Sequence, residues 1–305
     1  MKYINIGESN LKASEIALGC MRIAELEKGQ VEKLVNTALE EGINFFDHAD
    51  IYAGGKSEEI FSEAINMTPN LREKMIIQTK CSIRDGYYDY SKEHIISSVD
   101  ASLKRLKTEY VDTLLLHRPD TLMDPEEVAE AFTELHNSGK VKYFGVSNNN
   151  SMQIKLLNKY LKNKIIINQL QFSIMHSGIV DSGLNVNLDR DPSIDRAGSI
   201  LEYCRLKNIT IQAWSPYQYG FFEGVFLDNP KFPELNAKIN EMAAKKEVTN
   251  TAIATAWITR HPAKIQTVIG TTNLERVKDI CKSSNVELSR QEWYEIYRSA
   301  GNILP

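Results

Sequence analysis

Four titratable side chains in the first half of the chain stand where buried strands would end. They are Asp47, Tyr52, Lys80 and His117. A free phenol has a pKa of roughly 10, but a neighbouring ammonium lowers that pKa, and a carboxylate makes burial of the ammonium tolerable. An aspartate, a lysine and a tyrosine in contact would form a general acid, and the imidazole would hydrogen-bond the oxygen that is protonated. This set suits protonation of a carbonyl oxygen, and it lacks a source of electrons.

The second half of the chain supplies side chains suited to a bound nucleotide. Predicted strand ends carry hydroxyl, amide and indole groups, at Ser147, Asn148, Gln169 and Trp214. The indole offers a flat face on which a heteroaromatic ring can stack. Residues 270–276 open a helix whose free N–H groups and dipole favour a phosphate, with Arg276 near the same anion. Thr272 and Glu275 also have the spacing of a capping box, which is a purely structural interpretation of the same segment.

A repeated strand–helix pattern explains how residues so far apart in sequence could meet. Segments with strand character alternate with segments that have apolar residues at helical spacing, and the cycle occurs eight times. The expected strands cover 15–18, 43–47, 75–80, 111–116, 141–146, 164–169, 209–214 and 265–269. The expected helices cover 27–41, 56–66, 91–107, 125–138, 150–161, 196–207, 249–260 and 273–282. This pattern predicts an α/β fold, a closed (β/α)8 TIM barrel, with residues 1–305 as a single domain.

Several segments fall outside the eight cycles. Residues 2–13 resemble a small N-terminal β-hairpin, and residues 233–246 and 289–300 have the pattern of extra helices. Long connections cover 173–195 and 215–246. Because loops after barrel strands line the active face, we expect loops 118–124, 173–195 and 217–230 to shape a substrate pocket.

Composition excludes several classes of protein. The net charge of −4 offers no basic field for nucleic acid or an anionic membrane. The four scattered cysteines favour a reducing compartment over a disulfide framework or a zinc site. No apolar run has the length of a signal peptide or a membrane span. We therefore expect a cytoplasmic protein without a metal.

These motifs together resemble those of the aldo-keto reductase family, of the NADP-dependent bacterial type, from the first strand to the last helix. The residues that carry the resemblance are the segment 47–52, Lys80, His117, Gly145-Val146-Ser147-Asn148, Asn168-Gln169, Trp214-Ser215-Pro216 and the loop 270–276. The resemblance implies NAD(P)H-dependent reduction of an aldehyde or ketone, an oxidoreductase activity on CH–OH groups. Tyr52 would be the proton donor, Lys80 and Asp47 would tune it, and His117 would orient the carbonyl.

The resemblance also implies a cofactor site. Its contacts would come from Gly19, Cys20, Met21, Asp47, Ser147, Asn148, Gln169, Trp214, Ser215, Pro216, Tyr217, Gly270, Thr271, Thr272, Asn273, Arg276 and Asp279. Many family members have a lysine where this chain has Gly270 and an asparagine where it has Ile280. Arg276 remains to meet a 2′-phosphate, so NADP(H) is the expected cofactor, with NAD(H) as the alternative. The partner would be a small carbonyl substrate, and the protein a monomer or a weak homo-oligomer.

Three other interpretations remain open at this stage. The same fold could serve as a nucleotide-sensing accessory subunit. Lys80 could form a Schiff base in a lyase. His48 and Asp50, near His117, could be taken for metal ligands, although spacing alone is poor evidence and both residues could simply face the neighbouring helices.

Overall fold

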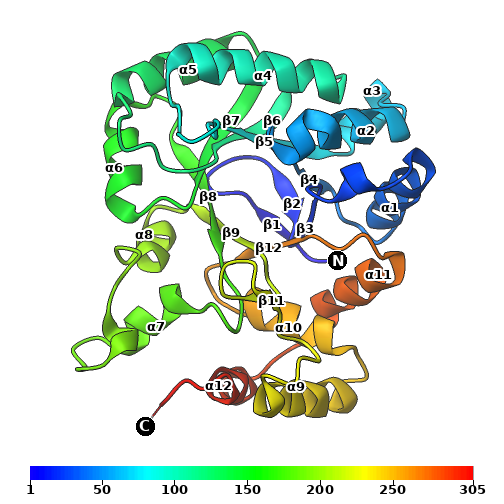
Figure 1. Cartoon of the computed structure of the whole chain (residues 1–305), viewed down its shortest axis with the longest axis vertical. Coiled ribbons are helices and arrows are strands. Elements are labelled where there is room, and N and C mark those ends of the chain that lie inside the picture. Colours follow the sequence, from blue (N-terminus) through cyan, green and yellow to red (C-terminus); the bar gives the residue numbers. More distant parts are fainter. Residues whose placement is uncertain (305) are drawn as a thin grey trace.

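The computed structural model describes residues 1–304 and contains the closed barrel of eight parallel strands predicted from the sequence. Around the ring the order is β12-β3-β4-β5-β6-β7-β8-β9 (Figure 1). The strands are β3 (Ile16–Gly19), β4 (Phe45–Asp47), β5 (Ile76–Cys81), β6 (Val111–Leu116), β7 (Val141–Ser147), β8 (Ile165–Gln171), β9 (Thr210–Trp214) and β12 (Gln266–Ile269). Parallel neighbours need a crossover connection, which the surrounding helices supply.

The crossover helices lie outside the ring of strands (Figure 1). They are α1 (Lys28–Glu40), α2 (Lys56–Ala64), α4 (Lys92–Leu106), α5 (Pro125–Asn137), α6 (Ser151–Tyr160), α8 (Ile200–Leu206), α10 (Asn250–Thr259) and α11 (Leu274–Cys281). The largest error in the predicted bounds concerns the helix expected at 196–207. It begins only at Ile200, because Gly198 and Ser199 have φ angles of +64° and +50°, in the left-handed region that does not continue an α-helix.

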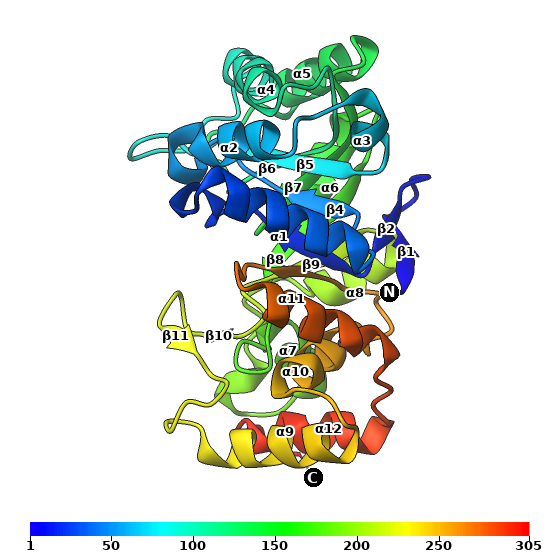
Figure 2. The same cartoon turned by 90° about the vertical axis from the view of Figure 1, so that its right-hand side faces the viewer.

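Other elements supplement the cycles. The expected extra helices are α9 (Pro233–Lys245) and α12 (Arg290–Ser299), which lie side by side in Figures 1 and 2. Two elements lie in connections for which the sequence suggested no regular structure: α7 (Gly178–Leu184) and the hairpin of β10 (Gln218–Tyr219) and β11 (Gly224–Val225). Short helices complete the order: α3 (Pro69–Glu73), η1 (Ile23–Glu25), η2 (Tyr52–Gly55), η3 (Asp191–Ser193) and η4 (Lys282–Asn285).

Two hairpins lie at opposite sides of the molecule, as Figure 2 shows. The predicted N-terminal hairpin, β1 (Tyr3–Asn5) and β2 (Lys12–Ser14), lies across the ring of strands on the side away from β10 and β11. Its turn is held against the barrel because the Gly7 N–H donates to Thr210 Oγ1 at 2.8 Å. Gly7 has a φ of +52°, and a Cβ there would lie 2.7 Å from Ile166 Cβ, so only glycine allows this approach.

The apolar core has two parts. The larger lies between the strands and the helices. A smaller one, the inner apolar cluster, lies inside the barrel and against the N-terminal hairpin, and it consists of Ile6, Ala13, Ala17, Phe45, Ile76, Leu115, Ile166, Ile167 and Val268. Within residues 1–304, no helix has both the length and the apolar character needed to cross a bilayer.

Candidate active site

Three of the four predicted catalytic side chains form a hydrogen-bonded chain at one end of the barrel. Lys80 Nζ lies 2.8 and 2.9 Å from the two carboxylate oxygens of Asp47. The same ammonium donates to Tyr52 Oη at 3.1 Å and to the His48 carbonyl at 2.8 Å. Lys80 is fully buried and Asp47 almost so. The ammonium therefore uses its three donors on a carboxylate, a phenol and a backbone carbonyl.

Backbone pairing brings Tyr52 to Lys80. Beyond the end of β4, the N–H groups of His48 and Asp50 still donate to β5, to the carbonyls of Gln78 and Lys80, at 2.8 and 3.0 Å. The chain then turns into η2, which begins at Tyr52. This extension carries the tyrosine over the lysine.

The helix after η2 is held against β5. The buried Glu58 of α2 accepts from Thr79 Oγ1 at 2.6 Å and from Arg105 Nε at 2.7 Å. Since Thr79 precedes Lys80 in the same strand, this bond fixes the helix that follows Tyr52 relative to the strand that carries the lysine.

The electrostatics of the three groups correct one expectation. Burial raises the pKa of Tyr52 above its ordinary value, although the Lys80 ammonium lowers it. The predicted net lowering was therefore wrong in direction, because desolvation outweighs the cation. Burial also lowers the pKa of Lys80, but Asp47 and Tyr52 more than reverse this, and the net pKa is raised. At neutral pH the phenol keeps its proton and the ammonium its charge.

His117 lies beside Tyr52, as the strand-end pattern predicted. The two rings meet edge to face with centroids 5.9 Å apart. The His117 N–H of the backbone donates to the Cys81 carbonyl at 2.8 Å, which positions the residue at the end of β6. Burial holds the pKa of the imidazole well below its usual range, and Lys80 and Arg118 lower it further. The ring is therefore neutral, and its buried Nδ1 has no partner within residues 1–304.

A chain of buried glutamines, which we call the amide chain, continues from Asp47 through the barrel interior. It consists of Gln78, Gln169, Gln212 and Gln266. Gln78 and Gln169 each donate Nε2 to Asp47 Oδ1, at 2.6 and 3.1 Å, and to Gln212 Oε1, at 2.9 and 3.0 Å. Gln212 Nε2 donates to Gln266 at 2.8 Å, and Gln266 donates to the Ser14 carbonyl at 2.7 Å. Two of these amides therefore hold the Asp47 carboxylate in place beside the Lys80 ammonium.

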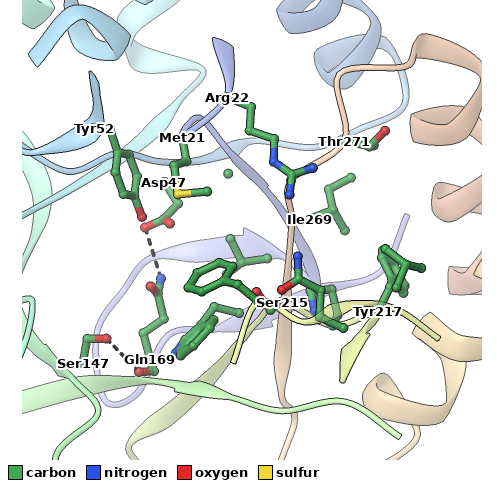
Figure 3. A pocket seen from close by; sticks show the side chains of 18 of the residues that line it. Met21, Arg22, Asp47, Tyr52, Ser147, Gln169, Ser215, Tyr217, Ile269 and Thr271 are labelled. Carbon is green, nitrogen blue, oxygen red and sulfur yellow. Dashed lines mark hydrogen bonds between the residues drawn. The ribbon is translucent and has the colours of Figure 1, made fainter. Parts of the chain in front are cut away.

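A cavity of about 410 Å³ opens above these groups (Figure 3). Most of the predicted cofactor residues line it, namely Gly19, Met21, Asp47, Ser147, Asn148, Gln169, Trp214, Ser215, Pro216, Tyr217, Gly270, Thr271 and Arg276, together with the catalytic candidates Tyr52 and His117. The phenol and Asp47 lie at one end, and Thr271 lies at another (Figure 3). A Cβ built on Gly270 meets nothing within 4 Å, so the wall is open where relatives are expected to carry a lysine.

Hydrogen bonds order the amide and indole groups of the cavity wall. Ser147 Oγ donates to the Gln169 carbonyl at 2.9 Å, and Asn148 Nδ2 donates to Ser147 Oγ at 2.7 Å. Trp214 Nε1 donates to Asn148 Oδ1 at 3.2 Å. Phe222 stacks on the indole with ring centroids 5.9 Å apart. A nicotinamide that stacked on that same face of Trp214 would displace Phe222.

Four predicted cofactor residues do not line the cavity: Cys20, Thr272, Asn273 and Asp279. Cys20 is fully buried, and burial raises the pKa of its thiol. Asp279 pairs with Lys282 at 2.7 Å. The expected side-chain cap is present, but on a different residue. Asn273, and not Thr272, is the N-cap of α11, and its side chain accepts a hydrogen bond from the Arg276 N–H at 2.9 Å.

Further residues line the cavity, among them Arg22, Arg118 and Phe222. Arg118 and Phe222 lie in loops 118–124 and 217–230, which were expected to shape the pocket, whereas Arg22 was not predicted. The Arg22 side chain extends over the cavity from the loop after β3 (Figure 3). Only the position in the sequence could have indicated the two arginines. Arg22 follows the first barrel strand by three residues, and Arg118 follows His117 directly. Arginine in a loop carries no distinctive pattern.

The structure gives His48 a packing role. Its ring meets Phe61 of α2 edge to face, with centroids 4.5 Å apart, and burial lowers its pKa from 6.5 to about 3. Within residues 1–304, no group of three or more histidine, cysteine or acidic side chains is arranged to hold a metal ion. His48 therefore faces a neighbouring helix, as the structural interpretation of this segment predicted.

Comparisons with known proteins agree with the geometry. The model of the Aldo/keto reductase family matches residues 15–300. The chain is 35% identical over 312 residues to the uncharacterized oxidoreductase YcsN of Bacillus subtilis (strain 168), covering 97% of each chain. It is 35% identical over 304 residues to a 6-dehydroglucose reductase of Agrobacterium fabrum (strain C58 / ATCC 33970), covering 95% of each. The crystal structure of a thermostable aldo-keto reductase, Tm1743, in complex with the inhibitor epalrestat matches with a TM-score of 0.79 and 24% identity, over 98% of this chain and 100% of that one.

Proposed function

Because the chain belongs to the aldo/keto reductase family, we propose that it reduces an aldehyde or ketone to an alcohol with NADPH, using Tyr52 as the proton donor. The observation that carries this proposal is the contact of Lys80 Nζ with Asp47, at 2.8 Å, and with Tyr52 Oη, at 3.1 Å, at the floor of a cavity. Relatives named as oxidoreductases and reductases support carbonyl reduction in general.

Each side chain has a role that follows from its surroundings. The Tyr52 phenol is neutral and donates its proton to the carbonyl oxygen as negative charge develops there. The Lys80 ammonium, 3.1 Å away, stabilises the phenolate that results. Asp47 keeps the ammonium charged, and the neutral His117 ring hydrogen-bonds the same carbonyl oxygen. The bound cofactor would supply the hydride.

The donor set of the cavity suits a dinucleotide. Ser147, Asn148 and Gln169 would meet a carboxamide, and Trp214 would stack on the nicotinamide ring. Gly270 and Thr271, in the loop that leads into α11, would face a phosphate, because the helix N-terminus that follows favours anions. Arg276 lines this part of the cavity and would pair with a 2′-phosphate, from which we propose a preference for NADPH over NADH.

The test compares the purified protein with its Tyr52→Phe variant. Wild type should oxidise NADPH in the presence of an aldehyde, and Tyr52→Phe should lower kcat by at least about 100-fold, as loss of a general acid does. NADPH should quench the tryptophan fluorescence of both proteins equally, since the phenol oxygen takes no part in holding the cofactor. Retained turnover in Tyr52→Phe would contradict the assignment of the proton donor.

A second variant, Arg276→Ala, tests the preference for NADPH. It should weaken NADPH binding and leave NADH binding nearly unchanged.

The two other activities considered for this fold receive less support. A Schiff-base lysine needs a lowered pKa, and the net pKa of Lys80 is raised. None of the relatives above is named as an accessory subunit.

A further inference from the structure

A second cavity of about 780 Å³ adjoins the one above Tyr52. The two share Arg118, Asn148 and Trp214 as wall residues. The outer part of its wall comes from α7, from residues 192–200 and from Ala300 and Asn302 near the C-terminus. A substrate whose carbonyl lies at Tyr52 therefore has room to extend past Arg118 into this second cavity.

Arg118 lies at the junction of the two cavities, over two aromatic rings and without an acidic partner among the described residues. Its guanidinium lies 5.6 Å from the ring centroid of Trp214 and 5.9 Å from that of Phe221. It is half-buried, and no carboxylate within residues 1–304 lies within ion-pair distance. By contrast, Arg72 and Arg105 are both paired with acids, at 2.7 Å. Stacking on aromatic rings leaves the N–H edges of a guanidinium available to a planar anion.

The other charged side chains around the second cavity are also compatible with an anionic ligand. Arg118 and Arg196 are the cations of its wall, and burial lowers the pKa of His176, which keeps that ring neutral. Asp181 is the one acid of the wall. Its two oxygens already accept hydrogen bonds, from Tyr297 Oη at 2.7 Å and from Ser177 Oγ at 3.1 Å. An anionic group would thus meet the guanidinium donors of this wall, while the Asp181 oxygens are already engaged in hydrogen bonds.

We propose that Arg118 binds a carboxylate of the substrate, so that the enzyme prefers aldehydes or ketones with an anionic group at the end away from the carbonyl. The inference rests on the proposed function. Arg118 follows His117 in sequence, so the residue that orients the carbonyl and the residue that binds the anion are placed by the same strand end. A guanidinium suits a carboxylate because it can donate two parallel hydrogen bonds.

The experiment measures kcat/KM with NADPH for two matched pairs of aldehydes. The rigid pair is 4-carboxybenzaldehyde and 4-methylbenzaldehyde, and the flexible pair is 4-oxobutanoate and butanal. Wild type should prefer the carboxylate in at least one pair by about tenfold or more, the size expected of a charge-assisted hydrogen bond. Arg118→Met should abolish that preference by slowing the anionic substrate while changing the neutral one by less than about threefold. Arg118→Lys should restore part of it.

The control variant is Arg84→Met, which removes an arginine that also lies over an aromatic ring, Tyr87, outside both cavities. It should leave both members of each pair unchanged. Equal losses for anionic and neutral aldehydes in Arg118→Met, or no wild-type preference in either pair, would overturn the assignment of Arg118 while leaving carbonyl reduction intact. If wild type reduced none of the four aldehydes with NADPH or NADH, the proposed function itself would fail. The wild-type preference is measured without any variant, so poor folding of Arg118→Met does not remove the test.

Discussion

The barrel interior holds two kinds of packing in contact with one another. The inner apolar cluster is built of aliphatic and phenyl groups, whereas the amide chain is built of glutamines that bond to one another and to Asp47. Strand β5 contributes to both, since its inward residues are Ile76 in the cluster, Gln78 in the amide chain and Lys80 in the site. Apolar contacts are non-directional and supply stability. The amides instead deliver directed donors to one carboxylate.

The largest effect should come from a cavity in the inner apolar cluster. Leu115→Ala removes a fully buried side chain and should lower the free energy of unfolding by about 3 kcal/mol, within the usual range for such sites. Urea unfolding measures this. NADPH binding to the folded variant should change by less than about twofold, because Leu115 is not among the residues that line the cavity above Tyr52. A large loss of affinity would show that the cluster also shapes the site.

His48 is a buried polar side chain without hydrogen-bond partners in the described part of the chain, and it should lower stability whereas the apolar cluster raises it. Both ring nitrogens of His48 lack hydrogen-bond partners within residues 1–304, and its pKa falls from 6.5 to about 3. The unfolded chain therefore binds more protons than the folded one between these pH values, and His48 makes the protein less stable as pH falls through 6.5. Wild type should lose about 2 kcal/mol more than His48→Leu between pH 7 and pH 5. Parallel stability curves for the two proteins would contradict the buried neutral ring.

The amide chain should affect rate more than stability. Gln78→Leu removes the 2.6 Å donor to Asp47 and should lower kcat about tenfold, equivalent to about 1.4 kcal/mol of lost charge-assisted bonding. NADPH affinity should stay nearly constant. The matched control is Thr113→Val, which removes only the 3.0 Å bond to Gln78 Oε1 and should change kcat less than threefold. Equal losses in both variants would mean that Gln78 acts through packing alone.

The smallest effect belongs to the far end of the amide chain. Gln266→Leu removes the bond to the Ser14 carbonyl and one to Gln212, and should lower the unfolding free energy by about 1 kcal/mol. Three hydrogen bonds separate it from Asp47, so kcat should change less than twofold. A loss of kcat as large as that of Gln78→Leu would show that the amides act as one unit and not as local donors.

The sequence predicted the barrel because hydrophobic periodicity and strand–helix alternation are local signals that the closed fold does not override. It failed at α7, because the glycine, serine and asparagine around Gly178–Leu184 are poor helix formers that tertiary packing nevertheless holds in a helix. The hairpin of β10 and β11 was also missed, since strands of two residues leave no alternation to detect.

Part of the site could also be predicted, because its side chains stand at strand ends that the sequence reveals. Asp47, Lys80 and Tyr52 have side chains with recognisable chemistry at strand ends, so their proximity follows from the topology. The direction of the Tyr52 pKa did not follow, because desolvation depends on packing that no spacing reveals. Of the amide chain only Gln169 was predicted, as a cofactor residue, and Arg118 was included only as part of loop 118–124. Glutamine within a strand and arginine within a loop become informative only when the register shows which way they point.

The N-terminal hairpin has a kinetic consequence for the whole molecule. Because side chains fill the barrel interior and the hairpin covers one of its ends, both reactants would have to enter and leave from the other end, where the two adjoining cavities lie. The reactant that binds deeper in the cavities must then bind first and dissociate last. The closed end of the barrel thus leaves a single side from which both reactants can bind.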